Sequence, residues 1–325
     1  MNKLNLRDYK ILSELDKNAK ASFNEIGRKL RLSPSVVERR VKNLINKGII
    51  RNFKTVINYK KLGWTYYSVY VKFQNINEEK KKEIGLYLKN HPLTGQCALC
   101  DGEWQLIYGF FGRDIFQVNE EIRRFNDKFG KYIKETQKII HIGSHHYYRG
   151  YLINKRIFRE YEPVLGGQEI TIKLDEESLQ LLNLIRNNTR INSVDISEKL
   201  KISLDSTRYK IKKLIKEGII YGSWLHLNPE KIDINFYKVL LKLKNTNQTI
   251  EKSMLNFLNN DKNVIRANNV FGSWDYFVDL EINKDEFRSF VDTFTKEFSD
   301  YIQEYETLIV YEEIKFDFSP IFPIK

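Results

Sequence analysis

A run of basic and hydroxyl side chains between residues 28 and 42 could contact nucleic acid. An arginine guanidinium can pair with guanine O6 and N7 in the major groove, and lysine or arginine can neutralise phosphates. Ser33 is a suitable N-cap and Pro34 a suitable first residue of a helix, whose first turns would face base edges. The residues expected to contact DNA are Arg28, Lys29, Arg31, Ser33, Ser35, Val36, Glu38, Arg39, Arg40 and Lys42.

These side chains would contribute in different ways. Arg39 is the predicted base-contacting residue, because its planar fork matches guanine. Arg40 and Lys42 would lie nearer the phosphates, and the basic residues that precede the helix would contact the backbone. The alternative is that the charges form only a solvated helix face.

Two other groups of residues could bind a metal or carry out redox chemistry. Cys97 and Cys100 have the spacing of half a zinc or redox site, but residues three apart in a strand point to opposite faces. His141 and His145 would share a strand face, with His146 beside them, yet no acidic or cysteine partner is adjacent. We therefore expect buried structural cysteines, an ordinary strand face and no metal site.

The chain repeats itself at an offset of 170 residues. Residues 33–50 and 203–220 share seven identities in eighteen positions without a gap, far above the roughly one expected by chance. The repeat supplies a second set of residues expected to contact DNA, which are Ser203, Ser206, Arg208, Tyr209, Lys210, Lys212 and Lys213.

Charge is concentrated in the first copy. Residues 1–60 hold 15 Lys and Arg against 5 Asp and Glu, a net charge of +10 within a total of +12. Residues 174–225 hold 9 against 7, or +2, and residues 226–325 hold 12 against 17, or −5. Such a local excess attracts a polyanion. We therefore expect the first copy to provide most of the DNA affinity.

Three short helices open each copy. In the first copy, apolar residues recur at helical spacing over residues 4–16, a second helix follows Ser22, and a third runs from Ser33 to Gly48. An extended segment follows, so three helices and a strand pair predict a winged helix-turn-helix. The predicted units are residues 1–60 and 173–228, and residues 151–172 form a linker.

A second type of domain follows each helical unit. Residues 61–150 alternate strands and helices in the order βαββαβ, and residues 229–318 repeat that order. The predicted fold is α+β: a tandem duplication of a winged helix-turn-helix followed by a ferredoxin-like βαββαβ domain.

These signatures resemble the Lrp/AsnC (feast/famine) family of regulators. The residues that carry the resemblance are Leu32-Ser33-Pro34, Arg40-Val41, Leu44 and Gly48-Ile49-Ile50. The second copy keeps Ser203 and Gly218-Ile219-Ile220 but has Leu204 in place of the proline. The resemblance covers nearly the whole chain as two copies, so the chain would be a fused pseudo-dimer that binds double-stranded DNA.

The resemblance also implies an effector site and self-association in the βαββαβ domains. The family's ligand turn usually resembles Gly-x-Tyr-Asp, and Trp replaces Tyr in both copies here. The implied effector-binding residues are Gly102, Trp104, Gly272, Trp274 and Asp275, and the effector would be amino-acid-like. The alternative for the two tryptophans is core or interface packing.

Several function classes are not expected. No apolar stretch of membrane-spanning length occurs and the N-terminus lacks the apolar core of a signal peptide, which predicts a cytoplasmic protein without a membrane partner. No phosphate loop, zinc signature or nucleophile motif is present, so neither enzyme activity nor a cofactor is expected. The alternative is a sirohaem-decarboxylase-like enzyme, whose architecture is similar and for which the histidines near residue 141 are the only support.

Overall fold

Two helical units of the same build occur in the computed structural model, which describes residues 4–157, 165–166 and 171–324. The first unit holds three helices: α1 (Leu6–Lys17), α2 (Phe23–Leu30) and α3 (Pro34–Asn46). The second holds α6 (Glu176–Ile185), α7 (Ser193–Leu200) and α8 (Leu204–Lys216). The third helix of each unit is followed by a glycine, with φ of +69° at Gly48 and +65° at Gly218. The predicted three-helix pattern is therefore confirmed in both copies.

The wing is shared between the copies. We expected each helical unit to be followed by its own strand pair, but β1 (Ile50–Ile57) pairs antiparallel with β7 (Ile220–Leu227) of the other copy. Apolar side chains of each strand enter the core of the opposite unit: Leu225 and Leu227 pack with the first unit, and Val56 and Ile57 with the second. Because the two strands come from different copies, their pairing cannot be predicted from a local hairpin within one copy.

The βαββαβ order is confirmed in both copies. The first consists of β2 (Thr65–Phe73), α4 (Glu78–Asn90), β3 (Thr94–Asp101), β4 (Leu106–Gly112), α5 (Ile115–Phe129) and β5 (Ile133–His146). The second consists of β8 (Asn235–Leu243), α9 (Gln248–Asn260), β9 (Val264–Phe271), β10 (Tyr276–Ile282), α10 (Lys284–Glu297) and β11 (Ile302–Phe316). Short 3-10 helices η1 (Tyr59–Leu62) and η4 (Pro229–Ile232) lead into the two domains, and η2 (Gly130–Tyr132) precedes β5.

The two sheets join into one closed antiparallel barrel of eight strands. Their order is β2-β4-β3-β11-β8-β10-β9-β5, and β5 pairs again with β2. The closing contacts between copies are β3 with β11 and β5 with β9. A barrel leaves no unpaired strand edge, so each copy satisfies the backbone hydrogen bonds of the other.

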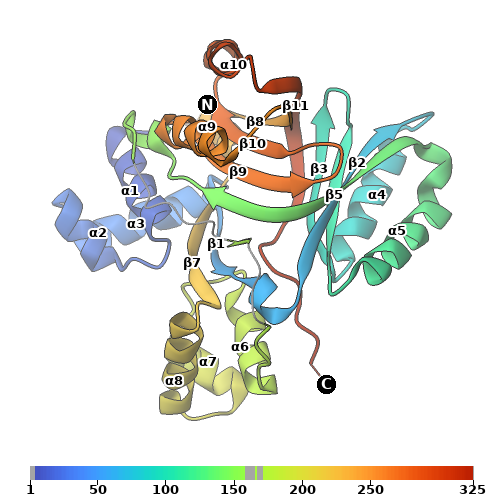
Figure 1. The fold of residues 1–325 in the computed structure, drawn as a ribbon. Coiled ribbons are helices and arrows are strands. Elements are labelled where there is room, and N and C mark those ends of the chain that lie inside the picture. Colours follow the sequence, from blue (N-terminus) through green and yellow to red (C-terminus); the bar gives the residue numbers. More distant parts are fainter. Residues whose placement is uncertain (1–3, 158–164, 167–170, 325) are drawn as a thin grey trace.

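Helices cover the outside of the barrel. In Figure 1, α4 and α5 lie on one side and α9 and α10 on another, and the two helical units lie below and to the left. The helix–sheet cores are separate from a third cluster that contains Trp104, Trp274, Phe277 and Leu308 from both copies. This third cluster fills the interior of one part of the barrel.

The described parts of the connecting segment and of the C-terminal tail contain only short regular elements. Between the copies lie η3 (Gly150–Ile153) and β6 (Leu165–Gly166), which pairs with β5. From the end of β11 to residue 324 the structure has no helix or strand, but Phe318 and Phe322 are buried against the second helical unit. In the described part of the chain, no helix is long and apolar enough to cross a membrane.

Candidate nucleic-acid interface

The third helix of the first unit presents a polar face to solvent. Ser33 caps α3 by accepting a hydrogen bond from the Val36 amide at 3.4 Å, and Pro34 occupies the first turn. Val37, Val41 and Leu44 are buried and fix the helix to its unit. The opposite face lines a shallow groove with Ser35, Glu38, Arg39, Lys42, Asn43 and Asn46.

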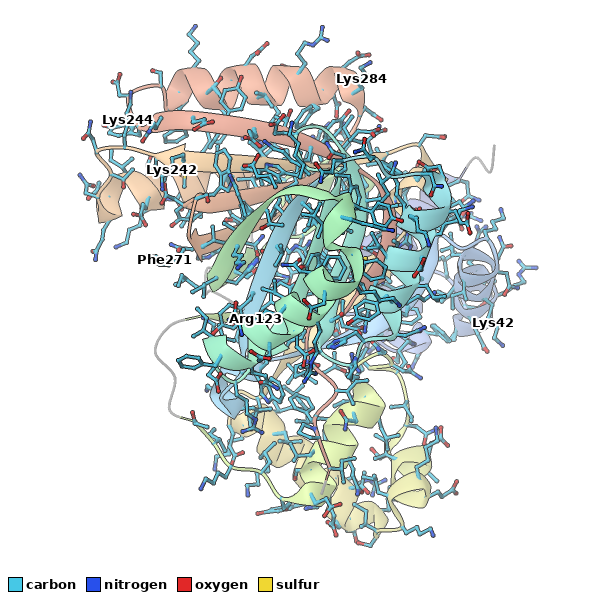
Figure 2. All side chains as sticks on the ribbon, turned by 90° about the vertical axis from the view of Figure 1, so that its right-hand side faces the viewer. Lys42, Arg123, Lys242, Lys244, Phe271 and Lys284 are labelled. Atoms are coloured by element: carbon cyan, nitrogen blue, oxygen red, sulfur yellow. The ribbon has the colours of Figure 1, made fainter. Side chains whose placement is uncertain are left out.

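The predicted DNA-contacting residues of the first copy are mostly exposed. Arg28, Arg31, Ser35 and Arg39 are exposed, whereas Val36 and Glu38 are half-buried. Lys42 is 2.7 Å from Glu38 but keeps 70% of its side chain exposed, and it points away from the unit in Figure 2. Lys29 lies 3.1 Å from Glu14, so α2 is tied to α1 at this point.

Arg40 lies on another side of α3 from Arg39. Its Nη1 donates to Asp8 Oδ1 at 2.7 Å and to Asn5 Oδ1 at 3.3 Å, and its side chain is 21% exposed. Both partners belong to the start of α1. The structure therefore places Arg40 in a contact that anchors α3 to α1.

Lys210 occupies the equivalent place in the second copy. Its Nζ lies 2.8 Å from Asp175 Oδ2 and 3.1 Å from Glu177 Oε2, at the start of α6. The hydrogen bond from Lys210 lowers the pKa of Asp175 to about 2. The two copies thus use one helix position in the same way.

The other predicted residues of the second copy lie on or near the outer face of α8. Ser203 caps the helix through the Ser206 amide at 3.1 Å. Arg208, Tyr209, Lys212 and Lys213 are exposed, with Tyr209 at 67%. This face carries fewer unpaired charges, because Arg208 lies 3.8 Å from Asp205 and Lys213 lies 3.9 Å from Glu217.

Gly27 lies in α2 just before the turn to α3 and was not among the residues predicted from the sequence. A Cβ at this position would lie 2.5 Å from the Leu32 carbonyl oxygen, closer than any real side chain approaches. The second copy has Ser197 here, and its hydroxyl donates to the Val194 carbonyl at 2.7 Å. The sequence signal for this tight turn was a small residue at both equivalent positions.

The residues of the implied effector turns lie between the two copies. Gly102 and Gly272 have φ of +132° and +148°, and a side chain on either would contact the last strand of the other copy. The indole of Trp104 donates to Glu306 Oε2 at 2.7 Å, and that of Trp274 donates to Gln137 Oε1 at 2.7 Å. Both rings are almost fully buried. The two tryptophans therefore pack at the interface between the copies, which was the alternative to effector binding. Effector binding by these turns stays a prediction.

Asp275 also supports the sheet. Its Oδ2 accepts a hydrogen bond from the Leu243 amide at 2.8 Å, and Oδ1 lies 3.2 Å from Lys242 Nζ. In the first copy, Gln105 takes the same place by accepting from the Phe73 amide at 3.0 Å. Both side chains complete the end of a strand, which explains why Gln can replace Asp in the first copy.

The two cysteines are buried on opposite faces of β3, as predicted. Cys97 packs among the helix–sheet core and Cys100 in the barrel interior. Burial raises the pKa of each thiol to about 12. Such thiols are almost entirely protonated near neutral pH and are poor nucleophiles or metal ligands.

The histidines on β5 do not share a face in the predicted way. A bulge between His141 and Gly143 shifts the register, so His141 pairs with Val270 and His145 with Ala267. Val270 faces the barrel interior and Ala267 the helix side. His141 instead lies with Ser144 and His146 around a small interior cavity of about 60 Å³. No group of three metal-binding side chains occurs in the described residues.

A larger cavity of about 420 Å³ lies where β7, η4 and the mouth of the barrel meet. Its charged lining residues are Arg51, Arg149, His226, Glu230, Asp233, Arg266, Glu281 and Glu313. Arg149 is buried between Asp16 and Glu281, at 2.6 and 2.7 Å. Sequence reasoning missed this site. The available signal was charged residues inside apolar strands, namely Arg266, Asp279 and Glu281.

The comparisons with known proteins agree with this geometry. The winged helix-turn-helix DNA-binding family matches residues 4–51 and 174–221, which are the two helical units. The chain is 36% identical over 125 residues to the transcriptional regulator LrpA of Pyrococcus horikoshii, covering 38% of this chain and 85% of that protein. The chain belongs to the Lrp/AsnC family of transcriptional regulators. It is also 40% identical over 99 residues to the regulator Ptr1 of Methanocaldococcus jannaschii, covering 29% of this chain and 67% of Ptr1.

The fold of the whole chain is similar to that of a solved enzyme. The siroheme decarboxylase NirDL superposes with a TM-score of 0.61 over 96% of this chain and 93% of the enzyme, at 13% sequence identity. At that identity the likeness concerns the fold alone. Lrp/AsnC features thus occur in this chain within a tandem architecture that an enzyme also adopts.

Proposed function

We propose that this Lrp/AsnC protein is a sequence-specific DNA-binding transcriptional regulator, built as a pseudo-dimer in one chain and without enzyme activity. The observation that carries the proposal is the exposed polar face of α3, with Arg39 and Lys42 outward on a helix whose cap and core are in place. A helix presented in this way can enter the major groove. The protein would act in the cytoplasm, with a small-molecule effector modulating it and with self-association through the βαββαβ domains.

The first copy would provide most of the affinity. Lys42 and Lys212 occupy equivalent positions, and both are exposed. They form a matched pair of variants, whereas Arg40 and Lys210 are held in internal ion pairs. Lys42→Glu should weaken DNA binding much more than Lys212→Glu and should lower the salt slope by about one unit or more.

The measurement is a titration with an enriched DNA fragment at several salt concentrations. Selection of bound fragments from random DNA supplies that fragment and also reports the number of half-sites. Two half-sites about one helical turn apart would fit two helices held by one chain. Equal losses for Lys42→Glu and Lys212→Glu would contradict the proposed division between the copies, and failure to enrich any sequence would contradict specific binding.

A decarboxylase-like enzyme is the second candidate, because the fold likeness covers nearly the whole chain and the 420 Å³ cavity is charged. The balance of charge in that cavity argues against a polycarboxylate tetrapyrrole. Three arginines, one histidine and four carboxylates line it, and the buried arginines already have carboxylate partners. Visible absorption after addition of an iron tetrapyrrole tests this candidate, since a shifted spectrum with stoichiometric binding would favour the enzyme.

A further inference from the structure

The 420 Å³ cavity has a counterpart in the first copy that aromatic rings fill. At the offset of 170 residues, Pro229 and Glu281 correspond to Tyr59 and Phe111. The rings of Tyr59 and Phe111 lie 4.9 Å apart, and Tyr66 packs against Phe111 at the same distance. Only about 60 Å³ is left on that side. The open cavity therefore arises from divergence between the copies.

Two of the arginines that line the open cavity do not use all their guanidinium nitrogens in described contacts, and Arg266 also lines the 60 Å³ cavity. Arg266 uses Nε and Nη2 for Asp279, at 2.8 and 2.7 Å, and no described residue accepts from its Nη1. Arg51 uses Nη1 for Glu313, and its side chain is 30% exposed at the entrance. A carboxylate is the natural acceptor for such guanidinium groups.

Beside Arg266, two buried cations share one carboxylate, whereas at the other wall Arg149 alone faces Asp16 and Glu281. Lys238 and Arg266 both contact Asp279, and together these cations lower the pKa of Asp279 despite its burial. Two cations thus face one carboxylate in a buried setting. At the other wall of the cavity, the carboxylate of Glu281 already accepts from Arg149 and Tyr151. A single added carboxylate would therefore be favoured next to Arg266 and not next to Glu281.

The uncharged lining is mostly apolar and includes four aromatic rings. Trp224, Phe236, Tyr311 and Phe316 line the cavity, and the Arg266 guanidinium lies over the Phe316 ring at 4.7 Å. Planar apolar walls with a few fixed polar groups are typical of small-molecule sites, and the volume is in their usual range of about 300–1,000 Å³. The ligand should therefore have a planar apolar body.

We propose that this cavity binds a small monocarboxylic acid with a planar apolar body, one per chain. The walls come from both wing strands and the barrel: Arg51 lies on β1, His226 on β7 and Glu313 on β11. Glu313 accepts from Arg51 and His226, both at 2.6 Å, and so joins all three elements. A bound ligand would therefore act on the Glu313 contacts between the wing strands and the barrel, and these strands orient the two helical units. This regulatory consequence rests on the proposed DNA-binding function, whereas the binding site does not.

Binding is tested by calorimetry on the full chain with phenylacetate, phenylacetamide and phenylalanine. The acid should bind, and the neutral amide should bind at least about tenfold more weakly, because it lacks the charge-assisted contact to Arg266. Arg266→Gln, which places the first-copy residue here, should weaken phenylacetate about tenfold or more. Asp279 keeps Lys238 in that variant. Arg288→Gln removes the same charge from the exposed face of α10 and should leave the affinity unchanged.

A second variant fills the cavity without removing a charge. Pro229→Tyr places here the ring that the first copy has at Tyr59 and should also weaken phenylacetate binding about tenfold or more. The proposal is overturned if phenylacetate does not bind the wild type at millimolar concentration, if the amide or phenylalanine binds as well as the acid, or if both variants retain the wild-type affinity. Tighter binding of an iron tetrapyrrole would also overturn it, in favour of the enzyme.

The regulatory link has its own measurement. Phenylacetate should change the DNA affinity of the wild type and not that of Arg266→Gln. If phenylacetate binds but the DNA affinity does not change, the regulatory link is overturned and the proposed binding site stands. Ligand binding by a protein that binds no DNA would overturn the proposed function alone.

Discussion

At the scale of single residues, neighbouring charges on one helix have different roles. Arg39 and Arg40 are adjacent in sequence, yet one faces solvent and the other contacts Asp8 at 2.7 Å. Lys210 repeats the internal contact with Asp175 in the second copy. The reason is helical geometry, since consecutive side chains project about 100° apart and only one of them can face α1.

Arg40→Ala and Arg39→Ala should therefore separate stability from DNA binding. Loss of the partly buried pair with Asp8 should lower the free energy of unfolding by about 1 kcal/mol. Arg39→Ala should leave stability within about 0.5 kcal/mol and weaken specific DNA binding by about 1–3 kcal/mol. Urea unfolding and DNA titration measure the two effects. A stability loss with Arg39→Ala that matches that of Arg40→Ala would contradict these positions.

A buried histidine should make stability depend on pH. Burial lowers the pKa of His141 to about 3, and the ring packs against Tyr66 and Phe277 with Nε2 3.0 Å from Ser68 Oγ. An unfolded histidine titrates near ~6.5, so the unfolded state binds the proton first as pH falls. The contribution of neutral His141 to the free energy of unfolding is fully present above pH ~6.5. It is lost as the pH falls toward 3, by about 1 kcal/mol per pH unit.

His141→Gln keeps a hydrogen-bonding side chain beside Ser68 but cannot titrate. We expect its stability to fall less steeply than that of the wild type between pH ~6.5 and ~4, measured by urea unfolding at each pH. Parallel stability curves for the two proteins would show that another group causes the pH dependence.

At the scale of elements, the two helix-turn-helix units differ in the tightness of their turn. Gly27 packs against the Leu32 carbonyl without room for a side chain, whereas Ser197 fits in the second unit. The cores of the units also depend on strands from the opposite copy, since Leu225 and Leu227 belong to the first unit's core. Neither unit is complete with its own residues alone.

Gly27→Ala should destabilise the first unit, because its methyl group would lie 2.5 Å from a backbone oxygen that cannot move freely. Overpacking of this kind typically costs about 1–3 kcal/mol. Ser197→Ala is the matched control and should cost less, since it removes only one hydrogen bond of about 1 kcal/mol. Thermal unfolding measures both variants, and a larger loss for Ser197→Ala would contradict the difference between the turns.

At the scale of the whole molecule, strand pairs between the two copies join them into one structure. The barrel needs β3 with β11 and β5 with β9, and the wing pair needs β1 with β7. Trp104 and Trp274 fix these contacts by donating to residues of the opposite copy. In the described part of the covalent link, the short strand β6 pairs with β5 but lies outside the closed order of eight strands.

Fragments 1–157 and 171–325 should therefore fold only together. Alone, each would expose unpaired strand edges and apolar faces, which favours aggregation or unfolding. Mixed after refolding, they should form a one-to-one complex with the circular dichroism spectrum of the intact chain. A stable, monomeric and cooperatively unfolding single fragment would contradict this dependence.

The sequence by itself determined the repeat, the helices with their caps, the βαββαβ order and the family. These features depend on local signals such as Ser33-Pro34, Gly48 and alternating apolar residues, which act within a few positions of the chain. The opposite faces of Cys97 and Cys100 followed for the same reason.

Only the tertiary structure decided the shared wing, the closed barrel and the open cavity. Each depends on contacts between residues far apart in sequence, such as Phe53 with Leu225 across the wing or Arg149 with Asp16 at the cavity. A strand's apolar face shows that it is covered but not by which partner, and a bulge such as the one after His141 reverses the faces without a sequence signal that we identified. The residues that carry charge were visible in the sequence, and the fold decided which of them face solvent.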